Sequence, residues 1–313
     1  MKMCDTTIMK WQCLVLFLFL KAQFGHSSKF NVVFLKHHKT TSDVTSSLTE
    51  EDSSDYVDNT NLACDNIGRK NKCKRRKVLK MKGKIVGGAD VRSIRFFPYH
   101  AKYGESCGAA IIHESWVITV AHCGIEPYVV VGTRHLYKGT KFYIEHHFEH
   151  PMWKAFKKEH YYDYDYQLLK LKQKLVFNAR VSAIKLGRFS KLNVGDIITV
   201  TGWGLLKFNG KRPTALQAVR VPVVSKEDCQ RVQYPMFRNT LTSRMFCAGY
   251  VDGEKDACQG DSGGAAAYRN HLVGLVSFGF ECAVPRAFGV YADISKVKHW
   301  LDNTTGIHFR FSM

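Results

Sequence analysis

The stretch Glu254-Lys-Asp-Ala-Cys-Gln-Gly-Asp-Ser-Gly-Gly264 sets a single serine, Ser262, between Gly260 and the pair Gly263-Gly264. Glycines carry no side chains, so the backbone N–H groups beside this serine can point at a reacting carbonyl oxygen. A serine hydroxyl is a weak nucleophile unless a neighbouring base takes its proton. The stretch therefore directs the search to a histidine and a carboxylate elsewhere in the chain.

Two other segments offer those groups. Trp116-Val-Ile-Thr-Val-Ala-His122-Cys123 ends an apolar run with a histidine, beside a cysteine that could anchor it. Asp163-Tyr-Asp165-Tyr-Gln-Leu-Leu-Lys-Leu171 sets carboxylates at the start of another apolar run. Base, orienting acid and nucleophile together are what acyl transfer by an activated hydroxyl requires. Each segment alone is weak evidence, since a histidine beside a cysteine is more often structural and an aspartate before a strand is commonly a turn residue.

The texture of the chain from residue 85 onward favours β-structure. Short apolar and β-branched runs recur between Gly, Asn and Asp, a spacing typical of an all-β sandwich or barrel. The runs are Ala109–Ile112, Trp116–Val120, Tyr128–Val131, Gln167–Leu171, Ile197–Thr201, Val219–Val224 and Leu272–Phe278. One helix is predicted over Ser295–Asp302, where Ile294, Val297, Trp300 and Leu301 share a face.

With Ile85-Val-Gly-Gly88 opening the region, and histidine, aspartate and serine following in that order, the chain resembles the trypsin-like (chymotrypsin-fold) serine proteases from Ile85 to about Gly306. The resemblance implies an all-β fold: two packed antiparallel β-barrels with a C-terminal helix, and an active site in the cleft between the barrels. His122 and Asp165 would come from the first barrel and Ser262 from the second.

The resemblance also implies the catalytic roles. Ser262 would attack the scissile carbonyl, His122 would take and return the proton, and Asp165 would hold the imidazole. Asp165 is preferred to Asp163 because the family's aspartate directly precedes the Leu-Leu-Lys-Leu strand, which leaves Asp163 as a solvated neighbour. The N–H groups of Gly260 and Ser262 would form the oxyanion hole.

Substrate specificity follows from positions that match the family's primary pocket. Asp256 would form its floor and favour a cationic side chain, while Gly279 and Gly289 would leave the pocket open. Ala257 stands where many trypsins have a serine that helps to solvate a lysine ammonium. Because arginine can pair with a carboxylate directly and bidentately, we expect cleavage after Arg in preference to Lys.

Further positions match or depart from the family pattern. Ser277 matches the residue that hydrogen-bonds the buried aspartate. Phe278 replaces the usual tryptophan on the substrate-binding strand, and Glu281 stands at the pocket rim where Gly is common. The triad residues are unaffected, so an active endopeptidase is the favoured reading. The alternative is a catalytically weak or inactive cationic homologue that acts as a binding or regulatory protein.

The N-terminus predicts secretion. Lys2 and Lys10 precede the eight-residue apolar run Cys13–Leu20, which is far shorter than the roughly 20 residues of a spanning helix. Residues 1–25 therefore read as a signal peptide rather than a signal anchor, and the protein as secreted and extracellular.

Residues 26–84 are predicted to form a charged, largely disordered pro-segment ahead of a protease domain over 85–313. Asp43–Asp65 holds seven acidic and no basic residues, whereas Arg69–Lys84 holds ten basic residues in sixteen; such runs are solvated linkers or processing sites. Cleavage after Lys84 would free Ile85, whose ammonium in this family pairs with Asp261. If Arg is preferred, Lys84 is a mediocre site for self-cleavage, which favours an upstream activating protease; autoactivation is the alternative.

Cysteine usage fits an oxidising compartment. By family position, the six cysteines of the protease domain form three bridges. The implied pairs are Cys107 with Cys123, Cys229 with Cys247, and Cys258 with Cys282. Cys64 and Cys73 of the pro-segment could close a small loop with each other. A further bridge common among relatives is absent, its positions being Ile198 and Tyr268.

The formal charge of +19, from 46 Lys+Arg and 27 Asp+Glu, first leaves nucleic acid open as a partner. No zinc-finger spacing, RNA-binding signature or phosphate loop accompanies it, so we expect no nucleic acid and at most weak polyanion binding.

His146-His-Phe-Glu-His150 matches the inverted zinc-protease pattern, but Pro151 follows and Lys141–Ile144 reads as strand, which favours a surface histidine cluster. The calcium-binding loop of trypsins needs carboxylates, but the matching region here contains the basic residues Arg134, Lys138 and Lys141, so we expect no calcium.

We therefore expect no metal and no cofactor. The expected partners are protein or peptide substrates with Arg or Lys, an activating protease and protease inhibitors, with the enzyme itself a monomer.

Overall fold

The computed structural model describes residues 88–155, 160–231, 240–253 and 255–312. The predicted signal peptide, the pro-segment and the Lys84–Ile85 bond lie outside these described residues, as do Cys64 and Cys73. None of the helices in the described part of the chain combines the length and the apolar character needed to cross a membrane.

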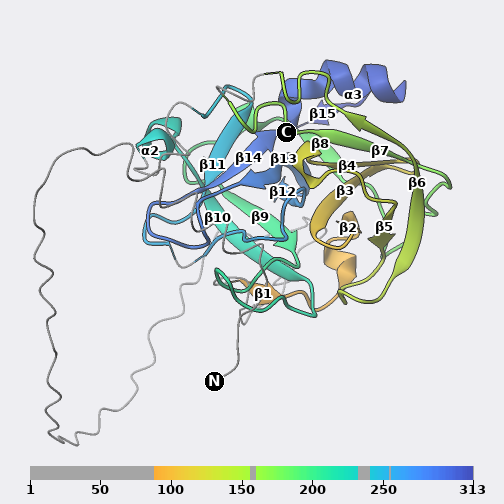
Figure 1. Ribbon diagram of the computed structural model, residues 1–313, viewed down its shortest axis with the longest axis horizontal. Helices are drawn as coiled ribbons and strands as arrows, with labels where there is room; N and C mark the ends of the chain where they lie inside the picture. Colours follow the sequence, from red (N-terminus) through yellow and green to blue (C-terminus); the bar gives the residue numbers. More distant parts are fainter. Residues whose placement is uncertain (1–87, 156–159, 232–239, 254, 313) are drawn as a thin grey trace, which may run out of the picture. The chain divides into compact units, whose positions relative to one another are not determined.

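The first barrel closes in the order β2-β3-β4-β7-β6-β5, and every neighbouring pair is antiparallel (Figure 1). Apolar side chains of these short strands, many of them β-branched, fill the interior of the barrel, where Ile111, Val117 and Leu169 are inaccessible to solvent. The strands are β2 His100–Tyr103, β3 Cys107–His113, β4 Trp116–Thr119, β5 Tyr128–Val131, β6 Thr140–Glu149 and β7 Gln167–Leu171.

The second barrel closes in the order β12-β9-β10-β11-β14-β13, because β12 also pairs with β13. Its strands are β9 Ile197–Gly202, β10 Gln217–Val224, β11 Met245–Ala248, β12 Ala265–Tyr268, β13 His271–Phe278 and β14 Gly289–Asp293. Three short strands extend it: β1 Ala89–Asp90 pairs with β10, while β8 Lys185–Gly187 runs parallel to β13 and to β15 Phe311–Ser312. Two closed six-stranded antiparallel barrels confirm the predicted chymotrypsin-like fold.

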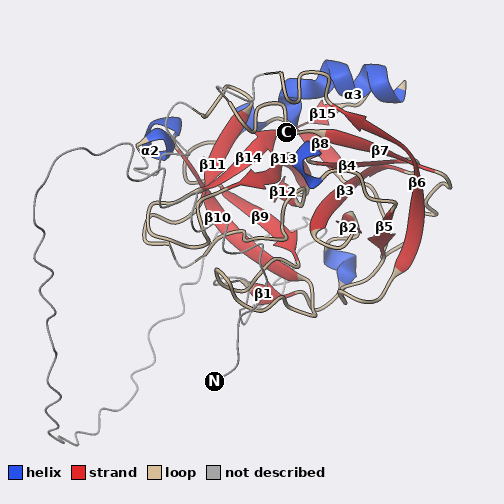
Figure 2. Ribbon diagram, viewed as in Figure 1, coloured by secondary structure: helices blue, strands red, loops and turns tan. Residues whose placement is uncertain are grey.

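One hydrophobic cluster joins the two barrels. Ile118 and Leu168 of the first barrel share it with Leu272 and Leu275 of the second, and all four are fully buried. Strands make up most of the regular structure, as Figure 2 shows. The only α-helices in the described ranges are α2 Lys226–Gln230 and α3 Lys298–Thr305; short 3₁₀ turns span Ile94–Phe96, Ala121–Cys123, Phe189–Lys191 and Ile294–Val297.

The predicted C-terminal helix is present in two parts. The 3₁₀ turn Ile294–Val297 leads directly into α3. Asp293 caps the start, because its side chain accepts a hydrogen bond from the Ser295 N–H at 2.9 Å. Leu301 buries its side chain in the cluster that joins the barrels.

Three disulfides staple the described structure, and they are the three pairs that the resemblance implies: Cys107–Cys123, Cys229–Cys247 and Cys258–Cys282. At the positions of the missing bridge, Ile198 is completely buried. Tyr268 packs against the same core and donates its hydroxyl to Asp196 at 3.1 Å. Both positions thus contribute to one hydrophobic cluster of the second barrel.

Candidate active site

His122 lies in the 3₁₀ turn that follows β4, and the Cys107–Cys123 disulfide ties this turn to the start of β3. Its ring Nδ1 is 2.7 Å from Asp165 Oδ2, and its backbone N–H donates to Asp165 Oδ1 at 2.9 Å. Because ring and backbone bind the two oxygens of one carboxylate, the imidazole has a fixed orientation. About a quarter of the His122 side chain, 23%, stays open to solvent.

Asp165 precedes β7 and its side chain is completely buried. Besides the two contacts from His122, its Oδ2 accepts the hydroxyl of Ser277 at 2.6 Å. Ser277 belongs to β13 of the second barrel, so this carboxylate is bonded from both barrels. Three such partners satisfy a charge that would otherwise be costly to bury.

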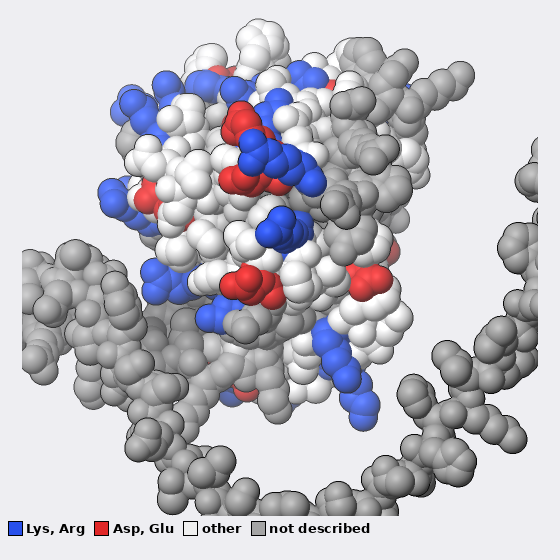
Figure 3. All heavy atoms as spheres, turned by 90° about the vertical axis from the view of Figure 1, so that its left-hand side faces the viewer, with Lys and Arg blue, Asp and Glu red and all other residues white. Residues whose placement is uncertain are grey.

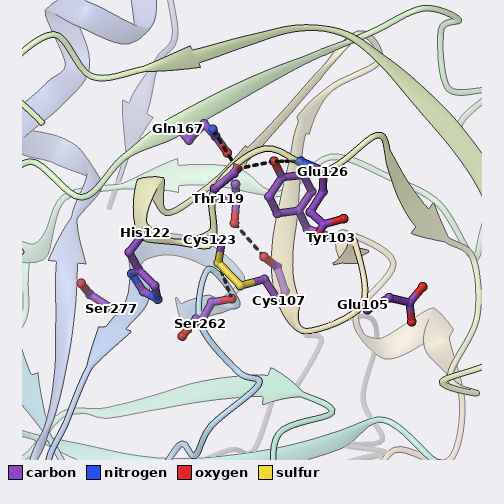
Figure 4. The surroundings of a disulfide bond; sticks show 12 residues. Tyr103, Glu105, Cys107, Thr119, His122, Cys123, Glu126, Gln167, Ser262 and Ser277 are labelled. Carbon is purple, nitrogen blue, oxygen red and sulfur yellow. Dashed lines mark hydrogen bonds between the residues drawn. A yellow bond between two sulfur atoms is a disulfide. The ribbon is translucent and has the colours of Figure 1, made fainter. Parts of the chain in front are cut away.

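Ser262 lies on the loop before β12. Its carbonyl oxygen accepts the Gly108 N–H at 2.8 Å and lies 3.9 Å from the disulfide sulfur of Cys123. The loop is thereby held against the segment that carries His122. In Figure 4 the imidazole of His122 lies between the side chains of Ser262 and Ser277.

The loop around Ser262 leaves two backbone donors unused. The N–H groups of Asp261, Gly263 and Gly264 bond carbonyl oxygens at 2.8–2.9 Å, whereas those of Gly260 and Ser262 have no partner among the described residues. Gly263 adopts a φ of +77°, and a Cβ there would lie 2.1 Å from Thr119 Oγ1. Only glycine fits this turn, which presents two N–H groups where an oxyanion could sit.

Asp261 is fully buried beside Ser262. Its carboxylate accepts the N–H groups of Gly204 at 2.7 Å and Cys258 at 2.9 Å. Burial raises the pKa of Asp261 to about 6, against the opposing effect of these hydrogen bonds and of the nearby Arg212 charge. Its predicted pairing with Ile85 falls outside the described residues and stays a prediction.

Asp256 is also buried, with 4% of its surface exposed. Its Oδ2 accepts the Ala283 N–H at 3.3 Å, but Oδ1 has no partner among the described residues, and neither does the nearby Tyr291 hydroxyl. Burial raises the pKa of Asp256 to about 7. An unpaired carboxylate oxygen in such a place favours a ligand that brings a positive charge.

The two glycines predicted to keep the primary pocket open face each other. A Cβ on Gly279 would lie 3.8 Å from Gly289 Cα, and a Cβ on Gly289 would lie 3.1 Å from Asp256 Oδ1. Any larger side chain on Gly289 would therefore crowd the carboxylate. The structure brings Asp256, Gly279 and Gly289 together, as the resemblance implies.

Tyr162 is a site residue that sequence reasoning missed. Its ring meets the His122 imidazole edge-on at 5.5 Å between centroids and stacks on Phe278 at 4.6 Å, with 14° between the planes. The only local signal was the tyrosine-rich run His160–Tyr166. Phe278, which replaces the usual tryptophan, thus packs against an aromatic ring that also touches the histidine.

The expectation that Asp163 is a solvated neighbour is wrong. Only 3% of Asp163 is exposed, and Arg244 binds both of its carboxylate oxygens. The physical reason is that Arg244, which is distant in sequence, supplies the charge and hydrogen bonds that make burial possible.

The histidines of the zinc-protease pattern lie on a strand and its end, because β6 runs to Glu149. The strand expected over Lys141–Ile144 is thus confirmed as part of β6. Within the described chain, His147 Nε2 is 2.9 Å from the Glu126 carbonyl oxygen, and the His150 ring stacks on Tyr164. His147 and His150 thus each contact a neighbouring loop of the first barrel, whereas 61% of the His146 side chain is exposed.

Comparisons with known proteins agree with this geometry. The Trypsin family model matches residues 85–301. Similar relatives include trypsin 5G1 of Aedes aegypti, 33% identical over 73% of this chain and 88% of its own length. The vitellin-degrading protease of Bombyx mori is 35% identical over 72% of this chain and 88% of its own length. The clotting factor G beta subunit of Tachypleus tridentatus is 33% identical over 64% of this chain and 71% of its own length. The chain, with its two barrels, therefore belongs to the trypsin family of serine proteases.

Proposed function

We propose that the protein is a secreted serine endopeptidase that hydrolyses peptide bonds after Arg and, more slowly, after Lys. The observation that carries the proposal is the hydrogen-bonded chain from Ser277 through Asp165 to His122, with Ser262 on the open side of the imidazole. Buried acid, oriented base and adjacent hydroxyl form the arrangement that acyl transfer needs.

In the proposed reaction, Ser262 Oγ attacks the carbonyl carbon of the scissile bond while His122 Nε2 takes the hydroxyl proton. The Gly260 and Ser262 N–H groups receive the developing oxyanion. The proton on His122 then passes to the leaving amine, which departs and leaves an acyl-enzyme. A water molecule repeats the sequence and frees Ser262. Throughout, Asp165 holds the tautomer and stabilises the imidazolium.

The specificity for a cationic side chain rests on Asp256. A Cβ on Gly289 would lie 3.1 Å from Asp256 Oδ1 and 3.2 Å from the Tyr291 hydroxyl, and neither oxygen has a hydrogen-bond partner among the described residues. A guanidinium has donors for both carboxylate oxygens at once, so it satisfies the buried charge without further acceptors.

Labelling by a fluorescent organophosphonate diphenyl ester with an arginine-like side chain tests the function. We expect labelling of the protein after cleavage at Lys84 and little before it, because the label reports an activated serine with a formed oxyanion hole. A Ser262→Ala variant supplies the blank. Correctly processed protein that takes up no label would support the inactive-homologue alternative.

We expect kcat/KM for a peptide ending in Arg to exceed that of the matched Lys peptide by about tenfold, the size of effect of one well-placed polar contact. Ala257→Ser adds a hydroxyl beside the carboxylate, so we expect it to raise the rate with Lys and to reduce the ratio severalfold. Paired peptide substrates measure both quantities. Equal rates for Arg and Lys in the unmodified enzyme would contradict the preference.

We further propose that the chain is made as a zymogen and activated after Lys84. The full burial of Asp261 and its raised pKa fit a carboxylate that awaits a cationic partner, which the ammonium of Ile85 would supply. Three disulfides in the described domain fit the secreted compartment that the N-terminus predicts. The proposed partners are protein substrates, an activating protease and protease inhibitors.

The positive charge of the chain is divided between the N-terminal region and the protease domain. Of the formal +19, residues 1–84 carry 16 basic and 8 acidic residues, and residues 85–313 carry 30 and 19, a net of +11. On the face seen in Figure 3, Lys and Arg are interspersed with Asp and Glu and with uncharged surface.

A further inference from the structure

An ion pair joins the barrels two residues from the candidate catalytic aspartate. Asp163 Oδ1 accepts Arg244 Nε at 2.8 Å, and Oδ2 accepts Arg244 Nη2 at 2.5 Å. Thr242 Oγ1 donates to Oδ1 at 2.9 Å. Asp163 leads into β7 of the first barrel, whereas Thr242 and Arg244 lead into β11 of the second. This bidentate pair is the geometry in which arginine fixes a carboxylate most firmly.

Arg244 also contacts the residues on either side of Asp165. Its guanidinium lies 4.1 Å from the ring centroid of Tyr164, within the range of a cation–π contact. Its carbonyl oxygen is 3.2 Å from the hydroxyl of Tyr166, which is also 2.8 Å from the Asp293 carbonyl oxygen. A single residue of the second barrel thus contacts Asp163, Tyr164 and Tyr166.

The segment held in this way has an unusual backbone. Tyr164 adopts a φ of +55°, a left-handed conformation that is unfavourable for a residue with a side chain. In a regular extended strand, Asp163 and Asp165 would point to the same side. The turn at Tyr164 breaks that alternation, so that Asp163 meets Arg244 while Asp165 meets His122 and Ser277.

Local hydrogen bonds hold the turn as well. The N–H of Tyr164 donates to Asp163 Oδ1 at 3.0 Å, and the N–H of Tyr166 donates to the Tyr164 carbonyl at 2.8 Å. The first of these bonds depends on the orientation of the Asp163 carboxylate, which Arg244 sets. Loss of Arg244 therefore weakens the support of the strained residue next to Asp165.

We propose that Asp163 and Arg244 are positioning residues for catalysis, which hold the Tyr164–Asp165 turn so that Asp165 aligns His122. The inference rests on the proposed function, since it assigns a task within that reaction. Neither residue touches the reacting atoms. Their effect passes through the carboxylate that fixes the imidazole, and small misplacements of such groups lower rates strongly.

Arg244→Gln tests the assignment, with Arg244→Lys as the conservative variant and Asp163→Asn as the isosteric change in the other partner. With activated full-length enzyme and titrated active sites, we expect Arg244→Gln to lower kcat by about 10- to 100-fold. KM should stay within about twofold, because Asp256 is untouched. Arg244→Lys keeps the charge but loses the guanidinium that binds both oxygens of Asp163, so its kcat should lie between those of Arg244→Gln and the unmodified enzyme.

Arg231→Gln is the matched control. Arg231 forms an exposed pair with Asp228 on the same barrel, at 3.3 Å, away from the triad. We expect its kcat to equal that of the unmodified enzyme. If Arg244→Gln and Asp163→Asn lower the Tm but keep full kcat per titrated site, the pair is merely structural and the proposal is overturned. Should Arg244→Gln not fold, Arg244→Lys and Asp163→Asn decide by the same measurement.

Proton NMR separates this proposal from the proposed function. The Nδ1 proton shared by His122 and Asp165 gives a low-field resonance that requires no substrate. We expect the resonance to shift or broaden in Arg244→Gln and to be unchanged in Arg231→Gln. An unmodified protein without peptidase activity would sink the proposed function, while this resonance would still support or refute the positioning pair. An identical resonance in both variants would refute it.

Discussion

Ser262→Ala is expected to lower kcat for an arginine peptide substrate by about 10⁶-fold, the scale on which loss of an activated nucleophile acts. The variant keeps the oriented His122–Asp165 pair and the two free N–H groups of the loop, but no atom remains that can form the acyl-enzyme. Residual catalysis of about 10³ over water is expected from binding and the oxyanion hole. Asp165→Asn should cost about 10⁴-fold, because the imidazole would lose its orienting acceptor.

Single-turnover kinetics on activated protein measures these losses. Ser190→Ala is the control, since it removes a hydroxyl from an exposed position in the 3₁₀ turn Phe189–Lys191. Benzamidine, a cationic probe, should bind Ser262→Ala with unchanged affinity because Asp256 is retained. An alanine variant that keeps more than a few per cent of the original kcat would show that Ser262 is not the nucleophile.

The strands predicted best from sequence are those buried on both faces. Tyr128–Val131 and Gln167–Leu171 coincide with β5 and β7, because most of their residues are apolar and buried, in short runs of the length typical of strands. Strand β6 was recognised only over Lys141–Ile144, although it runs from Thr140 to Glu149. Within it Ile144 alone is buried, and pairing with β5 and β7 rather than its own apolar pattern defines the strand.

In the candidate site, too, local motifs are easier to predict from sequence than contacts between distant segments. The residues of the three motifs could be proposed from sequence because each motif is contiguous. Contacts between distant segments could not, since Arg244 reaches Asp163 across 81 positions and Tyr162 stacks on Phe278 from the other barrel. Local patterns describe burial and turns, whereas partners of this kind are set by how the barrels pack. Asp163 was misread for that reason.

The pH dependence of cation binding follows from the environment of Asp256. Burial raises its pKa to about 7 when no cation is present. Only the ionised carboxylate attracts benzamidine, so affinity is full above pH 8 and is lost as the pH falls through 7. Between pH 8 and pH 6 we expect Kd to rise by about tenfold. Calorimetry across this range measures the change.

Asp256→Ser is expected to lower kcat/KM for arginine peptides by about 10⁴-fold, because a site that loses the partner of a buried charged group rejects that group strongly. The variant should also lose most of the pH dependence of benzamidine binding. Any dependence that remains would report Asp261, whose pKa burial raises to about 6. Asp252→Ser removes the same charge from an exposed position nearby and should leave both quantities unchanged. If Asp256→Ser kept its preference for arginine, the specificity would have to reside in another carboxylate, and Glu281 at the predicted pocket rim would be the first to replace.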